Sequence, residues 1–299
     1  MKALFLPWLI LHGCSIVLVD EPCDTAEPSP PTEDTGTAPL LWGAVGVGAV
    51  HSCGLDPENS VVCWGGNTDG QLDAPDGTYA SLAIGHAHGC ALDEGNAVTC
   101  WGRNDEGQSD LSGEYTVVSA GGAHTCGLRS TGLVACAGRD TEGQSSAPAE
   151  IFTDIAAGWA HTCGLRVDGQ VQCWGRIADS PEESVFSSVA SGQDFSCGLD
   201  EAGTIECWGE AAADLTGVAS EAAFVEIAAG AKHLCARTEA GLTQCWGDNE
   251  AGQLDAPEMK IHSLVSGSGS LHSCGIAGVE DELGEVSCWG LSAENQLAP

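Results

Sequence analysis

The sequence predicts an all-β fold, a seven-bladed β-propeller whose short blades have three to four strands and one hairpin disulfide each. A pair of cysteines recurs seven times in register along the chain. Apolar and β-branched segments bounded by Gly, Asp and Asn surround every pair, and none has a 3.6-residue period. Six pairs have a spacing of ten residues and the last has fourteen: Cys53 with Cys63, Cys90 with Cys100, Cys126 with Cys136, Cys163 with Cys173, Cys197 with Cys207, Cys235 with Cys245, and Cys274 with Cys288.

The first cysteines of successive pairs lie 34 to 39 residues apart, so each pair marks one repeat. A sheet of three or four short strands cannot bury two apolar faces alone, whereas seven sheets stacked around an axis can. An open solenoid is the alternative, but it requires capping repeats, which we do not find in the sequence. The repeats lie near 41–75, 76–110, 111–148, 149–181, 182–221, 222–257 and 258–299.

The copy that begins at Phe152 shows the expected elements in order. Its small-residue run at 155–158 suits a strand crowded against the axis. His161 and Cys163 share one face of the next strand, and Asp168-Gly169 predicts the hairpin turn. Tryptophans after the second cysteine are expected to fill the gaps between blades: Trp64, Trp101, Trp174, Trp208, Trp246 and Trp289.

The recurring phrases G-x-x-H-x-C-x-L, V-x-C-W-G and N-x-x-G-Q-L resemble the repeats of the regulator of chromosome condensation family. The resemblance extends from about Trp42 to Pro299 and implies a seven-bladed propeller. The short period is similar to that of bacterial, exported members, including a propeller-type β-lactamase inhibitor protein. The resemblance also implies that the six repeated histidines hydrogen-bond the backbone between blades. Ala137 replaces the usual Trp in the third repeat, and Phe195 replaces the His in the fifth.

The paired cysteines are interpreted as cross-strand disulfides. An odd-length turn sets Cys163 opposite Cys173, and opposed residues of paired strands are close enough to bond. Each bridge closes a short loop and is expected to contribute roughly 2 to 3 kcal/mol. Metal binding by His-x-Cys and Cys is a second interpretation, although the spacing differs from that of zinc sites. Buried free thiols are a third.

The amino terminus predicts export, as disulfides require. Residues 1–13 have one early Lys and the apolar run ALFLPWLIL, typical of a signal peptide. Leu11-His12-Gly13-Cys14 resembles a lipoprotein cleavage motif, so Cys14 is the expected lipidation site; an ordinary signal peptide is the alternative. Residues 14–40 read as an acidic, Pro- and Thr-rich tether in which Cys23 has no partner. The expected location is the bacterial cell envelope or the extracellular space.

The charge excludes one class of partner. The chain has 43 acidic and 9 basic residues, a formal net charge of −34. Nucleic-acid binding depends on a basic patch, and the scattered Arg and Lys residues do not form one in the sequence. Chromatin binding, which the resemblance to the nuclear family member would imply, therefore does not carry over. The predicted export likewise excludes nucleotide exchange on a small GTPase. We expect a monomer that contacts the membrane only through its lipid.

The sequence predicts no cofactor. The turn phrases at Asn67, Asn104 and Asp248-Asn249 could hold calcium, but they lack the alternating carboxylates of a calcium loop. Nucleophile elbows, phosphate loops and zinc-protease motifs are also missing from the sequence. We therefore expect no metal site, no catalytic residues and no enzyme activity.

The repeats differ most in the two residues between the Gly and the His. These turns should gather at one end of a propeller, where loops on a rigid scaffold commonly bind partners. We expect a protein-binding scaffold whose partner is an unknown protein at or outside the cell surface. The alternatives are a propeller lyase or hydrolase with its site at the channel mouth and a purely structural surface module. The candidate partner-binding residues are Val50, His86, Trp159, Gln193, Asp194, Lys232 and Leu271.

Overall fold

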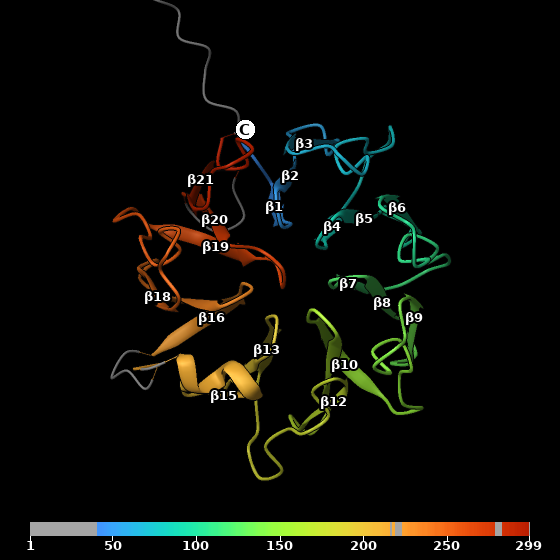
Figure 1. The fold of residues 1–299 in the computed structure, drawn as a ribbon, viewed down its shortest axis with the longest axis vertical. Coiled ribbons are helices and arrows are strands. Elements are labelled where there is room, and N and C mark those ends of the chain that lie inside the picture. The colour runs from blue at the N-terminus through green and yellow to red at the C-terminus, as the bar shows by residue number, and fades with distance from the viewer. Residues whose placement is uncertain (1–40, 216, 219–222, 279–282, 299) are drawn as a thin grey trace, which may run out of the picture. The chain divides into compact units, whose positions relative to one another are not determined.

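Seven antiparallel sheets surround a central axis in the computed structural model (Figure 1). The structure describes residues 41–215, 217–218, 223–278 and 283–298. We number the sheets as blades one to seven in chain order. The signal peptide, Cys14, Cys23 and the tether lie outside the described residues and stay predictions. Within the described residues, no helix has the length and apolar character needed to cross a bilayer.

Each blade has three strands that follow one another in space as in sequence, so the expected range of three to four resolves to three. The inner strands are β1 (Ala44–Val47), β4 (Ser81–Ile84), β7 (Val117–Ala120), β10 (Phe152–Ala157), β13 (Ser188–Ser191), β16 (Phe224–Ala229) and β19 (Ile261–Ser266). The middle strands are β2 (His51–Leu55), β5 (His88–Leu92), β8 (His124–Leu128), β11 (His161–Arg166), β14 (Ser196–Leu199), β17 (His233–Thr238) and β20 (His272–Ala277). The outer strands are β3 (Val61–Gly65), β6 (Val98–Gly102), β9 (Val134–Gly138), β12 (Val171–Gly175), β15 (Ile205–Trp208), β18 (Thr243–Gly247) and β21 (Glu285–Gly290), and one 3₁₀ turn, η1, spans Glu210–Asp214.

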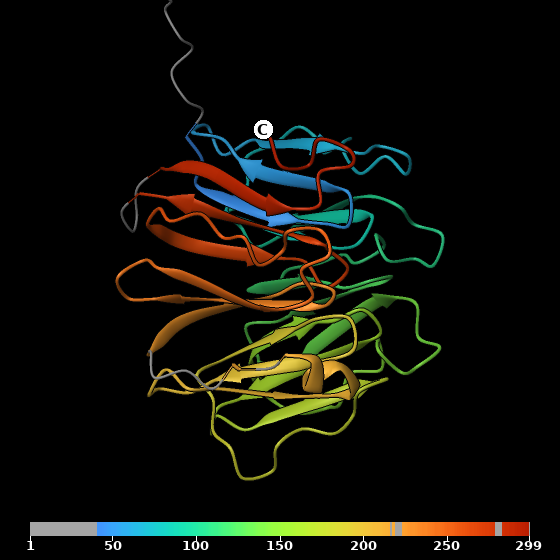
Figure 2. The ribbon, with the colours of Figure 1, turned by 60° about the vertical axis from the view of Figure 1, so that its left-hand side comes forward.

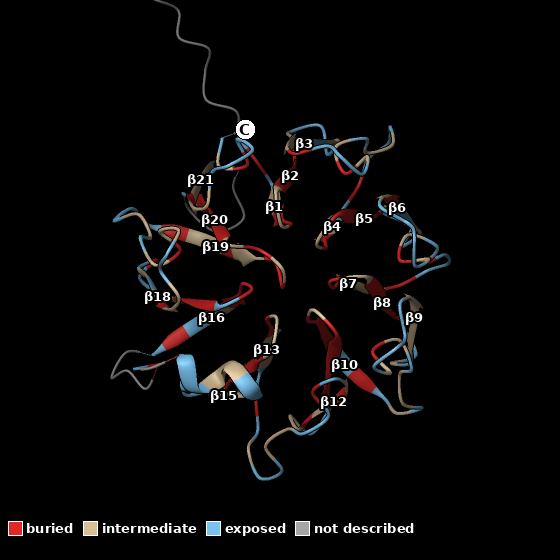
Figure 3. Ribbon diagram, in the orientation of Figure 1, coloured by how far each residue is buried: buried red, intermediate tan, exposed pale blue. Residues whose placement is uncertain are grey.

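The middle strands form the core. They are buried along nearly their whole length, because a strand lies on either side and a blade covers each face (Figure 3). Polar residues of these strands, including the histidine that begins most of them, are buried together with the apolar ones. These polar groups need hydrogen-bond partners, and several of the partners come from a neighbouring blade, as Thr125 does for His88.

Each blade has one disulfide, which joins its middle strand to its outer strand. The two cysteines of a blade face each other in register, as Cys163 and Cys173 do with 4.0 Å between their Cα atoms. The disulfide interpretation is confirmed for all seven pairs, and the metal and free-thiol interpretations are wrong for them. The bridges join Cys53 to Cys63, Cys90 to Cys100, Cys126 to Cys136, Cys163 to Cys173, Cys197 to Cys207, Cys235 to Cys245, and Cys274 to Cys288.

We call each interface between neighbouring blades a seam. One contact that recurs at the seams is made by tryptophan. The indole N–H of Trp101 in blade two donates to the backbone carbonyl of Gln71 in blade one at 3.0 Å. Trp174 donates to Gln144 in the same way. The tryptophans thus fill the gaps between blades, as predicted.

The seam between blades two and three lacks this tryptophan, because Ala137 occupies its position. Leu111 of blade two packs into the same cluster as Ala137. The equivalent residue in the first repeat is Ala74, which packs beside Trp101. A larger residue on one side of the seam therefore offsets the smaller one on the other.

The circle closes with the same contacts. Trp64 in blade one donates its indole N–H to the carbonyl of Gln296 at 2.9 Å, and the hydroxyl of Ser52 bonds the same carbonyl at 3.1 Å. The backbone of Trp42 pairs with Gly284 in blade seven. Figure 2 shows β1 and the β19–β20 region side by side, near the described ends of the chain. Blade one therefore packs on blade seven as on blade two.

Candidate functional site at one end of the propeller

One end of the propeller is formed by seven short turns, each joining an inner strand to a middle strand. We call this end the turn face. Backbone hydrogen bonds run from turn to turn around it. The N–H of Ala49 donates to His86 at 3.0 Å, that of His86 to Gly121 at 3.1 Å, and that of Trp159 to Gly192 at 3.1 Å. The turns are therefore a rigid, connected platform rather than independent loops.

A histidine follows six of the seven turns and is completely buried, and in five blades it lies against the glycine that begins the turn. A Cβ atom at Gly158 would overlap the imidazole of His161. The Nε2 atom of His161 lies 2.8 Å from the hydroxyl of Ser196 in the next blade. His124 pairs with Thr162 and His233 with Ser273 in the same way. The prediction of a bond to backbone is therefore wrong, because the partner is a side-chain hydroxyl of the following blade.

Burial keeps these imidazoles neutral. Loss of hydration lowers the pKa of His161 to about 3, and the nearby charges of His124 and Arg176 act in the same direction. Burial likewise lowers the pKa of His124 and His233 to about 4. These histidines are therefore neutral at neutral pH, and their hydrogen bonds join neighbouring blades.

The centre of the turn face is an aromatic contact across the axis. The rings of Trp159 and His86 meet edge to face, with centroids 4.6 Å apart. A Cβ atom at Gly269 would lie 2.7 Å from Nδ1 of His86 and 2.9 Å from the Trp159 ring. These residues belong to blades four, two and seven, which are not neighbours, so they meet at the axis. Both rings are half-buried.

His86 has a different environment from the seam histidines. Burial lowers its pKa, and the positive charge of Arg103 lowers it further, while Asp69 opposes this. Its Nδ1 atom has no hydrogen-bond partner among the described residues. Trp159 is neither a free surface residue nor folded into a neighbouring blade. It is half of a central aromatic pair, which we call the axial pair.

The other candidate residues surround the axial pair on the same face. Lys232 is exposed, while Val50, Gln193 and Leu271 are half-buried. Asp194 lies 3.2 Å from the guanidinium of Arg176. The structure therefore brings all seven candidates to one end, as the repeat pattern predicted for equivalent turns.

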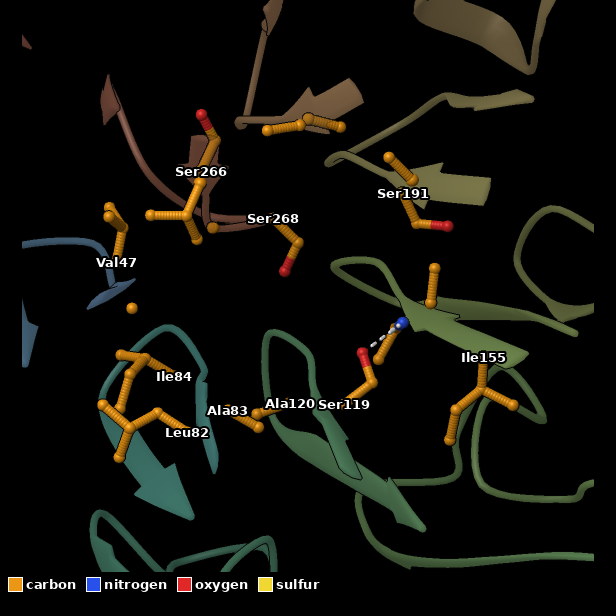
Figure 4. A pocket seen from close by; sticks show the side chains of 18 of the residues that line it. Val47, Leu82, Ala83, Ile84, Ser119, Ala120, Ile155, Ser191, Ser266 and Ser268 are labelled. Atoms are coloured by element: carbon orange, nitrogen blue, oxygen red, sulfur yellow. Dashed lines mark hydrogen bonds between the residues drawn. The ribbon is translucent and has the colours of Figure 1, made fainter. Parts of the chain in front are cut away.

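Behind the axial pair lies the central channel, with a cavity volume of about 260 Å³. Gly, Ala, Val, Leu, Ile and Ser side chains line it. The hydroxyl of Ser119 accepts a bond from the N–H of Ala157, and the hydroxyl of Ser268 points into the channel without a partner among the described residues (Figure 4). This lining differs from the titratable cluster that a lyase or hydrolase would need at the axis.

The turn phrases considered for calcium use their polar atoms within the turn. The side-chain oxygen of Asn67 accepts from the N–H of Leu72, and that of Gln71 accepts from the N–H of Asp69. The same bonds recur at Asn104 and Asn249. Among the described residues, no three His, Cys, Asp or Glu side chains are grouped so as to hold a metal ion.

Three arginines on this face were missed by the sequence reasoning, which considered the basic residues as scattered. Arg103, Arg139 and Arg176 each follow the glycine that ends an outer strand, in blades two, three and four. Their backbone N–H groups donate to Ala87, Ala123 and Ala160 of the turns. Their identical repeat position was the signal that could have placed them together.

The chain matches the family described as Regulator of chromosome condensation (RCC1) repeat over residues 44–71, 79–108, 116–144, 152–176 and 224–253. No curated protein sequence matches it significantly.

Solved structures show the same architecture. The CRINKLY WD40 ectodomain of the Arabidopsis thaliana receptor kinase ACR4 is 25% identical, with a TM-score of 0.71 over 86% of this chain and 98% of that one. The entire ectodomain of the Physcomitrella patens receptor kinase CR4 is 26% identical, with a TM-score of 0.70 over 84% and 74%. Prp20p from Saccharomyces cerevisiae, whose structure was described with its binding to Gsp1p and histones, is 17% identical, with a TM-score of 0.62 over 85% and 83%.

Proposed function

The chain belongs to the regulator of chromosome condensation (RCC1) repeat family, and we propose that it is a protein-binding scaffold that holds its partner on the turn face. The axial pair is the observation that carries this proposal. A half-buried Trp159 in edge-to-face contact with His86 offers a large, preordered apolar surface at the centre of a rigid platform. Tryptophan is enriched at the energetic centres of protein interfaces, and little ordering entropy is lost when such a residue binds.

The scaffold is proposed to work outside the cytoplasm. Seven disulfides fit an oxidising, extracellular environment. Export by the signal peptide, a lipid on Cys14 and a bacterial envelope location complete this proposal. Membrane fractionation of a Cys14→Ala variant tests the anchor. We expect the variant to appear in the soluble fraction, and retention in the membrane would contradict the lipid.

The binding proposal is tested by capture of a partner from the envelope and culture medium of the producing cells. Trp159→Ala should reduce capture at least tenfold, because a central aromatic often contributes more than about 2 kcal/mol to an interface. Val167→Ala is the matched control, since Val167 is an exposed apolar residue in the β11–β12 hairpin at the opposite end. Equal capture by wild type and Trp159→Ala, with loss in Val167→Ala, would contradict the turn face as the binding surface.

A further inference from the structure

The six arginines of the chain divide equally between the two ends of the propeller. Arg129, Arg166 and Arg237 lie at or beside the hairpins that join middle to outer strands. Arg103, Arg139 and Arg176 lie on the turn face. With only nine basic residues against 43 acidic ones, this grouping of three arginines in adjacent blades stands out from its surroundings.

The arginines of the hairpin end have structural partners. The guanidinium of Arg129 lies over the ring of Tyr115, 4.9 Å from its centroid. Arg237 pairs with Glu226 at 2.7 Å, and both side chains are largely buried. Arg166 pairs with Glu150 at 2.6 Å. These three cations stabilise the blades that carry them.

The arginines of the turn face are exposed, and their partners lie on the same surface. Arg103 lies 2.9 Å from Asp105, whose side chain is 71% exposed, and Arg139 donates to the hydroxyl of Thr141. Arg176 lies 3.2 Å from Asp194, which is 24% exposed, and 3.6 Å from Glu210, which is 82% exposed. Ion pairs of exposed guanidinium groups contribute little, so carboxylates of a ligand can replace them.

The position of these side chains relative to the axial pair follows from the backbone. Each arginine is bonded through its N–H to the turn of its own blade, at 2.8 to 2.9 Å. Those turns hold His86 and Trp159 in blades two and four, with blade three between them. The positive charge of Arg103 lowers the pKa of His86, as expected for two side chains on the same part of the turn face. We call Arg103, Arg139 and Arg176 the arginine arc.

The arc does not continue around the face. The equivalent positions in blades five and six carry Glu210 and Asp248, and those in blades one and seven carry Gly66 and Leu291. Beyond the arc lie acidic turn residues, including Asp105 and Glu106. The turn face therefore has an aromatic centre, a basic arc on one side and acidic surroundings.

Resting on the proposed function, we infer that the arginine arc binds carboxylates of the partner protein, presented on a short protruding acidic segment. Guanidinium groups bind carboxylates through paired, charge-assisted hydrogen bonds. An apolar side chain of the same segment packs on Trp159. A short segment is required because a broad acidic surface would meet the acidic rim of a chain with net charge −34.

The first test uses an end-blocked triglutamate peptide as the probe and an end-blocked trilysine peptide as its charge control. The side-chain Nε–H signals of the six arginines report binding in one NMR titration of the whole propeller. We expect triglutamate to shift the signals of Arg103, Arg139 and Arg176 saturably and to leave those of Arg129, Arg166 and Arg237 in place. Equal shifts at all six, or larger shifts with trilysine, would overturn the inference.

The second test separates this inference from the proposed function. The R103Q/R139Q/R176Q variant should lose triglutamate binding and capture of the partner, with about fivefold weaker binding for each arginine removed. Lys260→Gln is the control, because it removes one exposed positive charge beside the start of β19, at the end of the propeller opposite the turn face. If Trp159→Ala abolishes capture but the triple variant captures normally, the scaffold function stands and the carboxylate inference is wrong.

Discussion

The seam between blades four and five and the seam between blades five and six join equivalent positions with opposite chemistry. In the first, His161 bonds the hydroxyl of Ser196 at 2.8 Å. In the second, Phe195 and Leu234 occupy the same two positions and pack in one apolar cluster. Both partners have changed together, so no polar group is left unpaired. Replacing both members of a buried hydrogen bond by apolar groups is nearly neutral, whereas replacing one is costly.

The seam between blades one and two shows the costly case. His51 is buried like the other histidines, but neither of its ring nitrogens has a partner among the described residues. The hydroxyl that would bond it is replaced by Gly89, because Trp101 occupies the space where a side chain at this position would lie. Five seams thus have a paired histidine, one is apolar, and one has a buried imidazole without a partner in the described part of the chain.

The largest expected effect is a loss of stability in mild acid. It tests the six seams that contain a buried histidine in a single experiment. The pKa values of His51, His88, His124, His161, His233 and His272 are lowered from 6.5 to about 3 or 4, mainly by burial. The unfolded chain therefore binds protons that the folded chain does not. The free energy of unfolding is highest above pH 6.5 and falls by roughly 1 kcal/mol per histidine for each pH unit below it.

Urea unfolding between about pH 7.5 and 5 measures this slope. His161→Phe should reduce the slope by about one sixth, since one of six linked protons is removed. A slope unchanged from wild type in this variant, or no acid dependence above about pH 5, would contradict the account of the seams.

The next effect concerns the seam between blades two and three. Leu111→Ala should destabilise the protein by about 2 to 3 kcal/mol, because it leaves a cavity beside Ala137. Ala137→Trp should also destabilise it by about 1 to 3 kcal/mol through overpacking. The double variant recreates the Ala and Trp pairing of the other seams and should cost less than the sum. Strictly additive losses would show that the two residues do not compensate each other.

The smallest effect separates the paired and unpaired histidines with one substitution. His161→Phe removes a hydrogen bond and should cost about 1 kcal/mol. His51→Phe removes two unpaired buried nitrogens and should stabilise the protein by about 1 kcal/mol. Phe195 shows that a phenyl ring fits this position, where it lies against Gly192. The two variants are expected to change the free energy of unfolding by similar amounts in opposite directions, and urea unfolding of both measures this. A change of the same sign in both variants would contradict the distinction between paired and unpaired histidines.

The sequence revealed contacts within a repeat and concealed those between repeats. The position of Cys163 opposite Cys173 depends only on a ten-residue spacing and an odd turn, so it could be predicted. The bond between His124 and Thr162 joins residues 38 positions apart, in different repeats. This bond forms only at a particular rotation of one blade relative to the next. No local sequence pattern determines that rotation.

The site was half predictable for the same reason. Equivalence of the repeats brought the candidate turn residues to one end. The contact of His86 with Trp159 depends on the diameter of the channel, and Gly269, in the longer turn before His272, leaves room for both rings. Arg103, Arg139 and Arg176 look isolated in the sequence, although they are one arc in three dimensions.

The way in which the circle closes has a consequence for the order of the chain. The backbone of Trp42 donates to Gly284 at 2.8 Å, as Phe152 donates to Gly132 and Phe186 to Gly169. The joint between the last blade and the first is thus chemically the same as the joints inside the chain. A circular permutant, cut in the loop between blades four and five and joined across the present joint by a short linker, should fold to the same propeller. The folded ring therefore does not require any particular blade to come first in the sequence.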